Sequence, residues 1–175
     1  MTTHVALLRG INVGTAKRLA MPALRTMAEG LGYADVGTHI NSGNLLLSTE
    51  EDAPTLRARL EQGIEQTFGL HADVVVRTVE QLVAVLAANP FPDGDPSRVV
   101  IAFLAGPPPA GVAERLAALA TEDEPFLVHG LEVYVHHGHG QADSRLAAAL
   151  PKALGVSATV RNLRTVTRVA ELARG

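Results

Sequence analysis

Near the start of the chain, an apolar segment runs into an arginine and a loop rich in glycine, Arg9-Gly-Ile-Asn-Val-Gly14. Arg9 carries a fixed positive charge, the Asn12 amide donates and accepts hydrogen bonds, and Gly10 and Gly14 allow a ligand to approach the backbone. Lys17 adds an ammonium group shortly afterwards. Because guanidinium, ammonium and backbone N–H groups are common partners of phosphate and carboxylate, the segment predicts an anion site.

Two further polar segments carry similar groups. The segment Asn41-Ser-Gly-Asn44 separates two apolar runs, and its residues tolerate the positive φ angles of a tight hairpin. Its polar side chains, those of Asn41, Ser42 and Asn44, can orient a ligand by hydrogen bonds. Arg161 and Asn162 follow the last apolar run, where Asn162 also suits a helix N-cap.

A purely structural explanation of these segments stays open. Glycine and asparagine often occupy turns only because they tolerate unusual φ angles. An arginine after a strand is commonly a solvated residue at the rim of a sheet. The spacing of the residues alone does not separate this explanation from ligand binding.

The sequence assigns no catalytic residue and no cofactor, and it leaves open whether the protein is an enzyme. Ser42 lacks the Gly-x-Ser-x-Gly surroundings of an activated serine. His136, His137 and His139 are close in sequence, but alternation along a strand sends the first two to opposite faces, so we expect no metal site. The glycine loop lacks the third glycine of a dinucleotide turn and any Gly-Lys-Ser/Thr, which argues against a dehydrogenase or an NTPase.

The elements that must position these groups follow from the hydrophobic pattern. Residues 5–8 are apolar on both faces, as in a central strand, and residues 24–31 carry a helical apolar stripe. Both halves of the chain then repeat the order strand, helix, strand, strand, helix, strand and extra helix. This order predicts an α+β protein with two ferredoxin-like subdomains and antiparallel sheets. We expect the subdomains at 1–89 and 98–175, joined by a linker at 90–97.

The expected topology would bring two of the polar segments together. In a ferredoxin-like sheet the strand order is four, one, three, two, so the end of the first strand lies beside the start of the third. Residues 9–14 and 41–44 would then share one rim of the sheet. The first helix begins on the same rim, where its N-terminal N–H groups and dipole favour an anion.

Composition limits the class of protein. The 15 Lys+Arg and 18 Asp+Glu residues give a net charge of -3, which provides no bulk attraction to nucleic acid or to an anionic membrane. The chain has no cysteine, which fits a reducing compartment. It shows neither a charged leader with an apolar run nor a segment long enough to cross a bilayer. We therefore expect a cytoplasmic monomer or homodimer without membrane association.

Several of these motifs occur together in a known family. The chain resembles domain-of-unknown-function family 1697, a widespread bacterial family, in the segments Ala6-Leu-Leu-Arg-Gly-Ile-Asn-Val-Gly14, Ile40-Asn-Ser-Gly-Asn44, Asn89-Pro-Phe91 and Thr159-Val-Arg-Asn162, and in Thr165. The resemblance covers nearly the full chain and implies two ferredoxin-like halves, but no reaction. Family members usually carry Gly and Gln where this chain has Thr15 and Asn41, and Thr15 stiffens the first loop.

These observations predict a protein that binds a small anionic, phosphorylated or nucleotide-like ligand and could also transform it. Arg9, Lys17 and Arg161 would hold the anion, and Asn12, Ser42 and Asn44 would orient it. An RNA-associated module is an alternative, although such sheets stack bases on aromatic residues, which are only 3% of this chain. A regulatory or scaffolding protein is another, because an edge strand at residues 72–77 could pair between subunits.

Overall fold

The first half of the chain forms a four-stranded antiparallel sheet with helices. The computed structural model describes residues 1–14 and 18–175. The elements in order are β1 (Thr2–Arg9), α1 (Met21–Gly30), β2 (Ala34–His39), β3 (Asn44–Thr49), α2 (Ala53–Phe68), β4 (Asp73–Thr78) and α3 (Val79–Ala87). The strands lie in the order β2-β3-β1-β4, each antiparallel to its neighbours. The predicted strand order is therefore confirmed.

The second half repeats the same topology. Its elements are β5 (Val99–Leu104), α4 (Val112–Ala117), β6 (Phe126–His129), β7 (Glu132–His136), α5 (Arg145–Leu154), β8 (Ala158–Asn162) and α6 (Leu163–Arg174). The sheet order is β6-β7-β5-β8, again antiparallel throughout. Two four-stranded antiparallel sheets with helices confirm the α+β class and the two ferredoxin-like subdomains.

The compact units divide the chain at other positions than the sequence suggests. Met1–Val83 and Val169–Gly175 form one unit, and Ala84–Arg168 form the other. One division therefore falls within α3 and the other within α6. The sequence instead places the linker at 90–97 and assigns all of 98–175 to the second subdomain.

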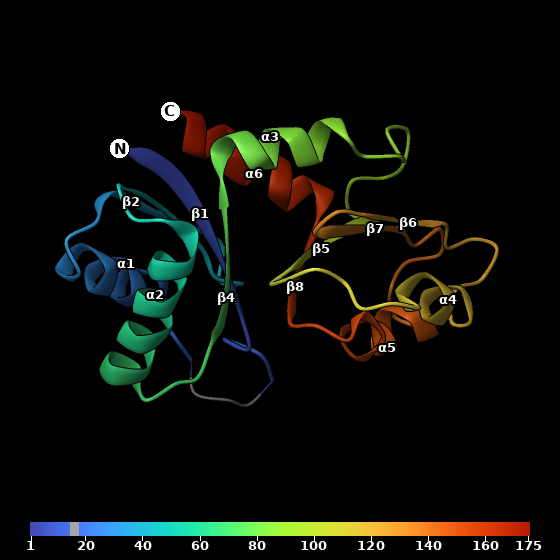
Figure 1. The fold of residues 1–175 in the computed structure, drawn as a ribbon, viewed down its shortest axis with the longest axis horizontal. Coiled ribbons are helices and arrows are strands. Elements are labelled where there is room, and N and C mark those ends of the chain that lie inside the picture. The colour runs from blue at the N-terminus through green and yellow to red at the C-terminus, as the bar shows by residue number, and fades with distance from the viewer. Residues whose placement is uncertain (15–17) are drawn as a thin grey trace. The chain divides into compact units, whose positions relative to one another are not determined.

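Each sheet has one face that packs against helices of its own unit. In the first unit α1 and α2 cover this face together (Figure 1). Alternate residues of β1, Ala6 and Leu8, contact a fully buried helical stripe, because successive side chains of a strand point to opposite faces. That stripe consists of Leu24, Leu56, Leu60 and Ile64. The equivalent core of the second unit contains Val100, Ala102, Leu104, Leu116, Leu146 and Leu150.

Local sequence signals set the ends of the helices. The Asp52 carboxylate accepts a hydrogen bond from the Thr55 N–H at 2.8 Å and so caps α2, which ends at Gly69 with a φ of 64°. Thr78 and Gln81 form a reciprocal capping box at α3, with distances of 2.9 and 3.2 Å. Aspartate and threonine at the starts of these helices and glycine at the end of α2 are the residue types preferred at such positions.

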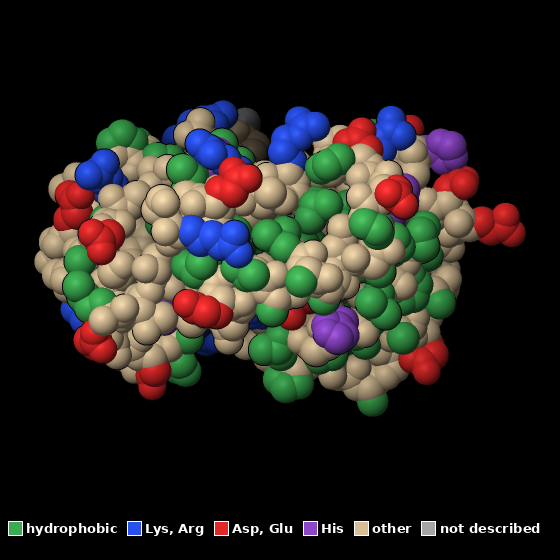
Figure 2. Space-filling view, turned by 90° about the horizontal axis from the view of Figure 1, so that it is seen from above, with side chains coloured by type: hydrophobic (Ala, Val, Ile, Leu, Met, Phe, Trp, Pro, Cys, Tyr) green, Lys and Arg blue, Asp and Glu red, His purple; other side chains and the backbone are tan. Residues whose placement is uncertain are grey.

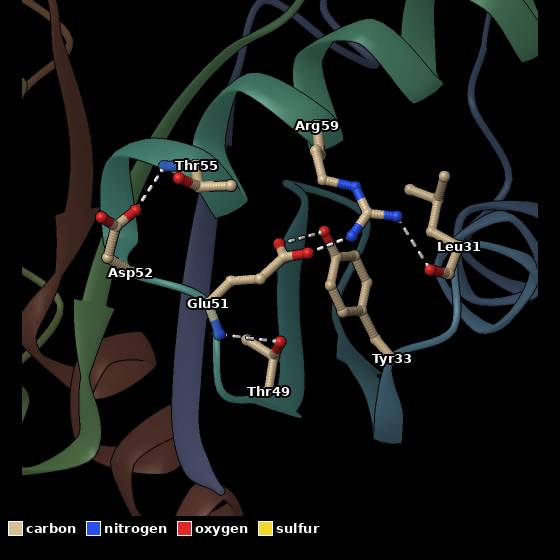
Figure 3. Close-up of polar contacts among 7 residues, drawn as sticks. All are labelled: Leu31, Tyr33, Thr49, Glu51, Asp52, Thr55 and Arg59. Carbon is tan, nitrogen blue, oxygen red and sulfur yellow. Dashed lines mark hydrogen bonds and ion pairs between the residues drawn. The ribbon is translucent and has the colours of Figure 1, made fainter.

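A polar network joins the end of α1 to β2 and α2 (Figure 3). The Glu51 carboxylate accepts hydrogen bonds from the Tyr33 hydroxyl, at 2.9 Å, and from the Arg59 guanidinium. Arg59 also donates to the Leu31 carbonyl oxygen at 3.1 Å, and its guanidinium lies 5.3 Å from the centre of the Tyr33 ring. Burial, assisted by the Glu51 carboxylate, raises the pKa of Tyr33 to about 12.

The helices of the structure give no sign of a membrane span. Within the described residues, none is both long enough and apolar enough to cross a bilayer.

Candidate functional site

The structure places the loop after β1 against the hairpin between β2 and β3. Leu7 is the cross-strand partner of Asn44, and the Leu8 N–H donates to the Gly43 carbonyl oxygen at 2.8 Å. Beyond the strands, the Asn12 side chain donates to the Asn41 carbonyl oxygen at 2.9 Å. Two segments that are distant in the sequence therefore meet on one rim of the first sheet.

The Asn12 side chain is occupied by backbone groups. Its Nδ2 donates to the Leu19 carbonyl oxygen at 2.8 Å as well as to Asn41, and its Oδ1 accepts the Leu19 N–H at 2.7 Å. Its φ angle of 53° lies in the left-handed region, which asparagine tolerates better than most residues. Asn12 therefore holds both ends of its loop against the hairpin, and both N–H groups of its amide are already used, so neither is left to donate to an anionic ligand.

The hairpin is fixed from the inside by Asn44. This residue is fully buried, and its Nδ2 donates to the His39 carbonyl oxygen at 2.8 Å and to the Ser42 hydroxyl at 3.2 Å. Ser42 is half-buried and Asn41 is exposed. Of the three hairpin side chains expected to orient a ligand, that of Asn41 is the most accessible.

Beneath the surface this corner is packed with aliphatic groups. Ile11 is only 4% exposed, and a Cβ added to Gly43 would lie 2.6 Å from the Ile11 Cδ1 and 2.9 Å from the Leu8 Cβ. Gly43 also has a φ of 85°, so glycine is required there for two reasons. A ligand at this corner would lie on the outside, against the exposed residues of the two loops.

We use the term Arg9 rim for the exposed residues of the two loops: Arg9, Gly10, Val13, Gly14, Arg18, Ile40 and Asn41. Gly10 and Gly14 have positive φ angles of 81° and 61°. Helix α1 follows with Ala20 as its N-cap, a residue whose side chain cannot cap the first turn. Lys17, the other cation predicted for this site, lies outside the described residues.

Arg161 and Asn162 have structural partners in the second unit. Arg161 is half-buried and donates to the Val160 carbonyl oxygen at 3.0 Å, and burial lowers its pKa to about 10. The Asn162 Oδ1 accepts the Thr165 N–H at 2.9 Å, which confirms the predicted helix cap. Arg161 and Arg9 belong to different compact units.

The first unit contains a counterpart of Arg161 that sequence reasoning missed. Arg77 is 7% exposed, precedes the capping residue Thr78 and donates to the Val76 carbonyl oxygen at 3.0 Å. Arg161 has the same place before Asn162. The repeated order of arginine, cap and helix was readable in the sequence and would have indicated a shared structural role.

A buried polar cluster in the second unit was also missed. The Glu124 Oε1 accepts a hydrogen bond from the Ser144 hydroxyl and lies 2.9 Å from the His137 Nδ1, while its Oε2 accepts the Thr121 N–H at 3.2 Å. Glu124 is 6% exposed and His137 is fully buried. Among the described residues, the Nε2 of His137 has no hydrogen-bond partner.

The geometry of this cluster is that of a structural anchor. Burial raises the pKa of Glu124, but hydrogen bonds from Ser144, His137 and Thr121 outweigh this effect, so the pKa lies below its ordinary value. Ser144 also accepts the Ala147 N–H at 2.9 Å and so caps α5. Because Ser144 donates to glutamate and not to histidine, the arrangement differs from a Ser-His pair that activates a nucleophile.

The three neighbouring histidines take separate partners. His137 contacts Glu124, the exposed His139 lies 3.0 Å from the Asp123 carboxylate, and the His136 ring centre is 5.8 Å from that of Phe91. In the part of the chain that the structure describes, no three His, Cys, Asp or Glu side chains are grouped so as to hold a metal ion.

A hollow of about 480 Å³ lies in the first unit, away from the predicted site residues. Its polar lining includes Thr3, Thr38 and Ser48, and the Thr3 and Ser48 hydroxyl oxygens are 3.3 Å apart. Asp35 and Arg174 also line it, and both are exposed.

Comparisons with known proteins give a family and a fold. The profile of a family described as "Protein of unknown function (DUF1697)" matches residues 1–134. No curated protein matches the chain. Among solved structures, that of the conserved bacterial protein SP0830 from Streptococcus pneumoniae is similar, with a TM-score of 0.82 over 98% of each chain. At 23% sequence identity this likeness shows the fold alone.

Proposed function

The chain belongs to the DUF1697 family, whose description names no activity, and we propose from the geometry of this chain that the Arg9 rim binds a small anionic ligand such as a phosphorylated or nucleotide-like compound. The hydrogen bond from Asn12 to the Asn41 carbonyl oxygen supports this proposal most directly, because it holds the two loops together. Arg9 and Arg18 are exposed on the same rim and supply positive charge. We also infer that the protein acts in the cytoplasm, because it contains no cysteine.

Each group at the Arg9 rim has a specific role in the proposal. Arg9 makes the charged contact with the anion, since a guanidinium can donate two parallel hydrogen bonds to phosphate or carboxylate. The backbone N–H groups near Gly10 and Gly14 approach the ligand where no side chain intervenes. Asn12 and Asn44 fix the position of the loops, and Asn41 offers the accessible amide.

Small-molecule binding fits the surface charge better than binding of a long nucleic acid. A nucleic-acid surface normally requires an extended basic area, because each phosphate contact adds to the affinity. On the face drawn in Figure 2, acidic and basic side chains are interspersed. The net charge of -3 also disfavours a polyanion.

A thermal-shift screen tests the proposal. The chain is heated with inorganic phosphate, a nucleoside monophosphate, citrate or a short single-stranded RNA, and the same series is run on Arg9→Ala and Arg25→Ala. Arg25 is an exposed arginine of α1 that pairs with Glu29 at 2.9 Å, so its replacement removes the same charge outside the rim.

We expect one or more small anions to raise the melting temperature of the parent and of Arg25→Ala by about 5–10 °C at 100 times the dissociation constant. In Arg9→Ala the shift should disappear while the melting temperature without ligand stays unchanged. A shift that only RNA produces, and that salt abolishes, would instead favour the nucleic-acid alternative. If none of the ligands shifts the parent, the proposal is wrong.

A further inference from the structure

Two large apolar side chains are exposed on the Arg9 rim. Val13 is 68% exposed and Ile40 is 49% exposed. Val13 follows Asn12 in the chain, and Ile40 precedes Asn41. Because Asn12 and Asn41 are joined by a hydrogen bond, Val13 and Ile40 lie on the same rim as Arg9. Val13 and Ile40 therefore place apolar surface on the same rim as the Arg9 guanidinium.

Isoleucine is also an unusual residue for the backbone conformation at position 40. Its φ angle is 49°, in the left-handed region, where a β-branched side chain meets the following carbonyl group and strain results. Glycine or asparagine would relieve the strain, and both are common in hairpins. Core packing does not account for isoleucine at this position, because half of its surface is exposed. Strained residues of this kind are often found where a ligand is held.

We propose that Ile40 and Val13 contact the organic part of the anion held by Arg9, so that the ligand is a small phosphate monoester with an apolar or aromatic substituent. This inference rests on the proposed function and specifies its ligand. The phosphate would lie at Arg9 and the backbone N–H groups, and the substituent would cover the two exposed side chains. Burying apolar surface of both partners then adds to the affinity that the charge provides.

A free ligand is a better occupant than a phospholipid headgroup within a bilayer. Stable membrane attachment requires a long apolar helix face or a lipid chain, and the Arg9 rim offers two apolar side chains. The net charge of -3 also opposes approach to an anionic bilayer. The phosphate chemistry is the same in both cases, so the experiment includes both sources.

The test compares two probes that differ only in the substituent. Inorganic phosphate and phenyl phosphate are titrated calorimetrically at about pH 8, where both are mainly dianions. The proteins are the parent, Ile40→Asn, Val13→Ser and the control Leu127→Asn, which replaces an apolar β6 residue of similar exposure in the other compact unit. Sedimentation with vesicles of phosphatidylglycerol and phosphatidylcholine forms the membrane arm.

We expect the parent and Leu127→Asn to bind phenyl phosphate about tenfold more tightly than inorganic phosphate. In Ile40→Asn the ratio should fall to about twofold or less, while the affinity for inorganic phosphate is retained. Val13→Ser should show a smaller loss of the same kind. Ile40→Asn should also melt at an equal or higher temperature than the parent, because the strain at this residue is relieved.

Three results would overturn the inference. Equal preference for phenyl phosphate in Ile40→Asn and in the parent would show that the apolar pair does not contact the substituent, while leaving anion binding intact. Vesicle binding that Ile40→Asn abolishes, without any preference for free phenyl phosphate, would assign the pair to a membrane. If the parent binds neither probe, the proposed function itself fails and this inference with it.

Discussion

The Asn12 side chain donates a hydrogen bond to the Asn41 carbonyl oxygen over a sequence separation of 29 residues, at a distance of 2.9 Å. The same amide makes two hydrogen bonds with Leu19, so one side chain fastens the start of the loop, its end and the neighbouring hairpin. The position of Arg9 and of the glycines around it therefore depends on a residue whose two amide N–H groups are already bonded to the backbone.

Replacement of Asn12 should loosen the loop. We expect Asn12→Ala to lower the free energy of unfolding by about 1–3 kcal/mol, because it leaves backbone groups of Leu19 unpaired and places alanine at a positive φ. Asn12→Asp should be at least as destabilising, because it keeps the acceptor for the Leu19 N–H but turns a carboxylate oxygen toward the carbonyl oxygens of Leu19 and Asn41. Urea denaturation measures both changes. Equal stability of Asn12→Ala and the parent would contradict the anchoring role.

The corner under the Arg9 rim should not accept a larger residue at Gly43. Gly43→Ala should lower the free energy of unfolding by about 2–4 kcal/mol, because the added methyl group meets Ile11 and Leu8 in addition to the strain of a positive φ. Gly32→Ala is a matched control: its φ is 92°, but nothing lies within 4 Å of the added carbon. It should cost only about 1 kcal/mol. Similar losses in both variants would argue against close packing at this corner.

The Glu124 cluster should give stability that depends on pH. Because the pKa of Glu124 is lower in the folded chain than its ordinary value of 4.5, the stability that this carboxylate contributes is complete above pH 4.5. It is lost as the pH falls through the lowered pKa. Ser144→Ala should therefore cost about 1.5–3 kcal/mol near neutral pH and less under acidic conditions. Urea denaturation at both pH values measures the difference, with Thr167→Ala as control, because the Thr167 hydroxyl donates to a backbone carbonyl oxygen, that of Leu163. A loss that is independent of pH would contradict this account.

Both tyrosines should ionise at a higher pH than an exposed tyrosine does. The pKa of Tyr33 is raised to about 12 by burial and by Glu51, and that of Tyr134 to about 12 by burial and by Glu132. The stability that they contribute is complete below their ordinary pKa of 10.0 and is lost as the pH rises toward about 12. Tyrosinate absorbance should show little ionisation of folded protein near pH 10. Tyr33→Phe should remove half of the tyrosinate absorbance reached at the end of the titration, because the chain has two tyrosines. A titration step near pH 10 would contradict the burial of either ring.

Much of the fold was predictable because it depends on local signals. The positions of Asp52, Gly69, Thr78 and Asn162 fixed helix ends, and the apolar runs fixed the strands. Their order was sufficient to predict both sheets, since short connections leave few topologies. The adjacency of residues 9–14 and 41–44 followed from this strand order.

The side-chain partners were less predictable because they depend on tertiary contacts. Asn12 was interpreted as a ligand contact, since the sequence does not reveal its bonds to Leu19 and Asn41. The pairing of Glu124 with His137 requires the turn before β6 to fold against the end of β7. The positive φ of Ile40 could not be expected either, because isoleucine normally avoids that conformation.

The central claim, that Arg9 holds an anion, is tested most directly by calorimetric titration of inorganic phosphate into the parent, Arg9→Ala and Arg25→Ala at low ionic strength. Loss of a charged hydrogen bond should weaken binding to Arg9→Ala by about tenfold or more, while Arg25→Ala binds as the parent does. Equal affinity of Arg9→Ala and the parent, or no binding by the parent, would contradict the account.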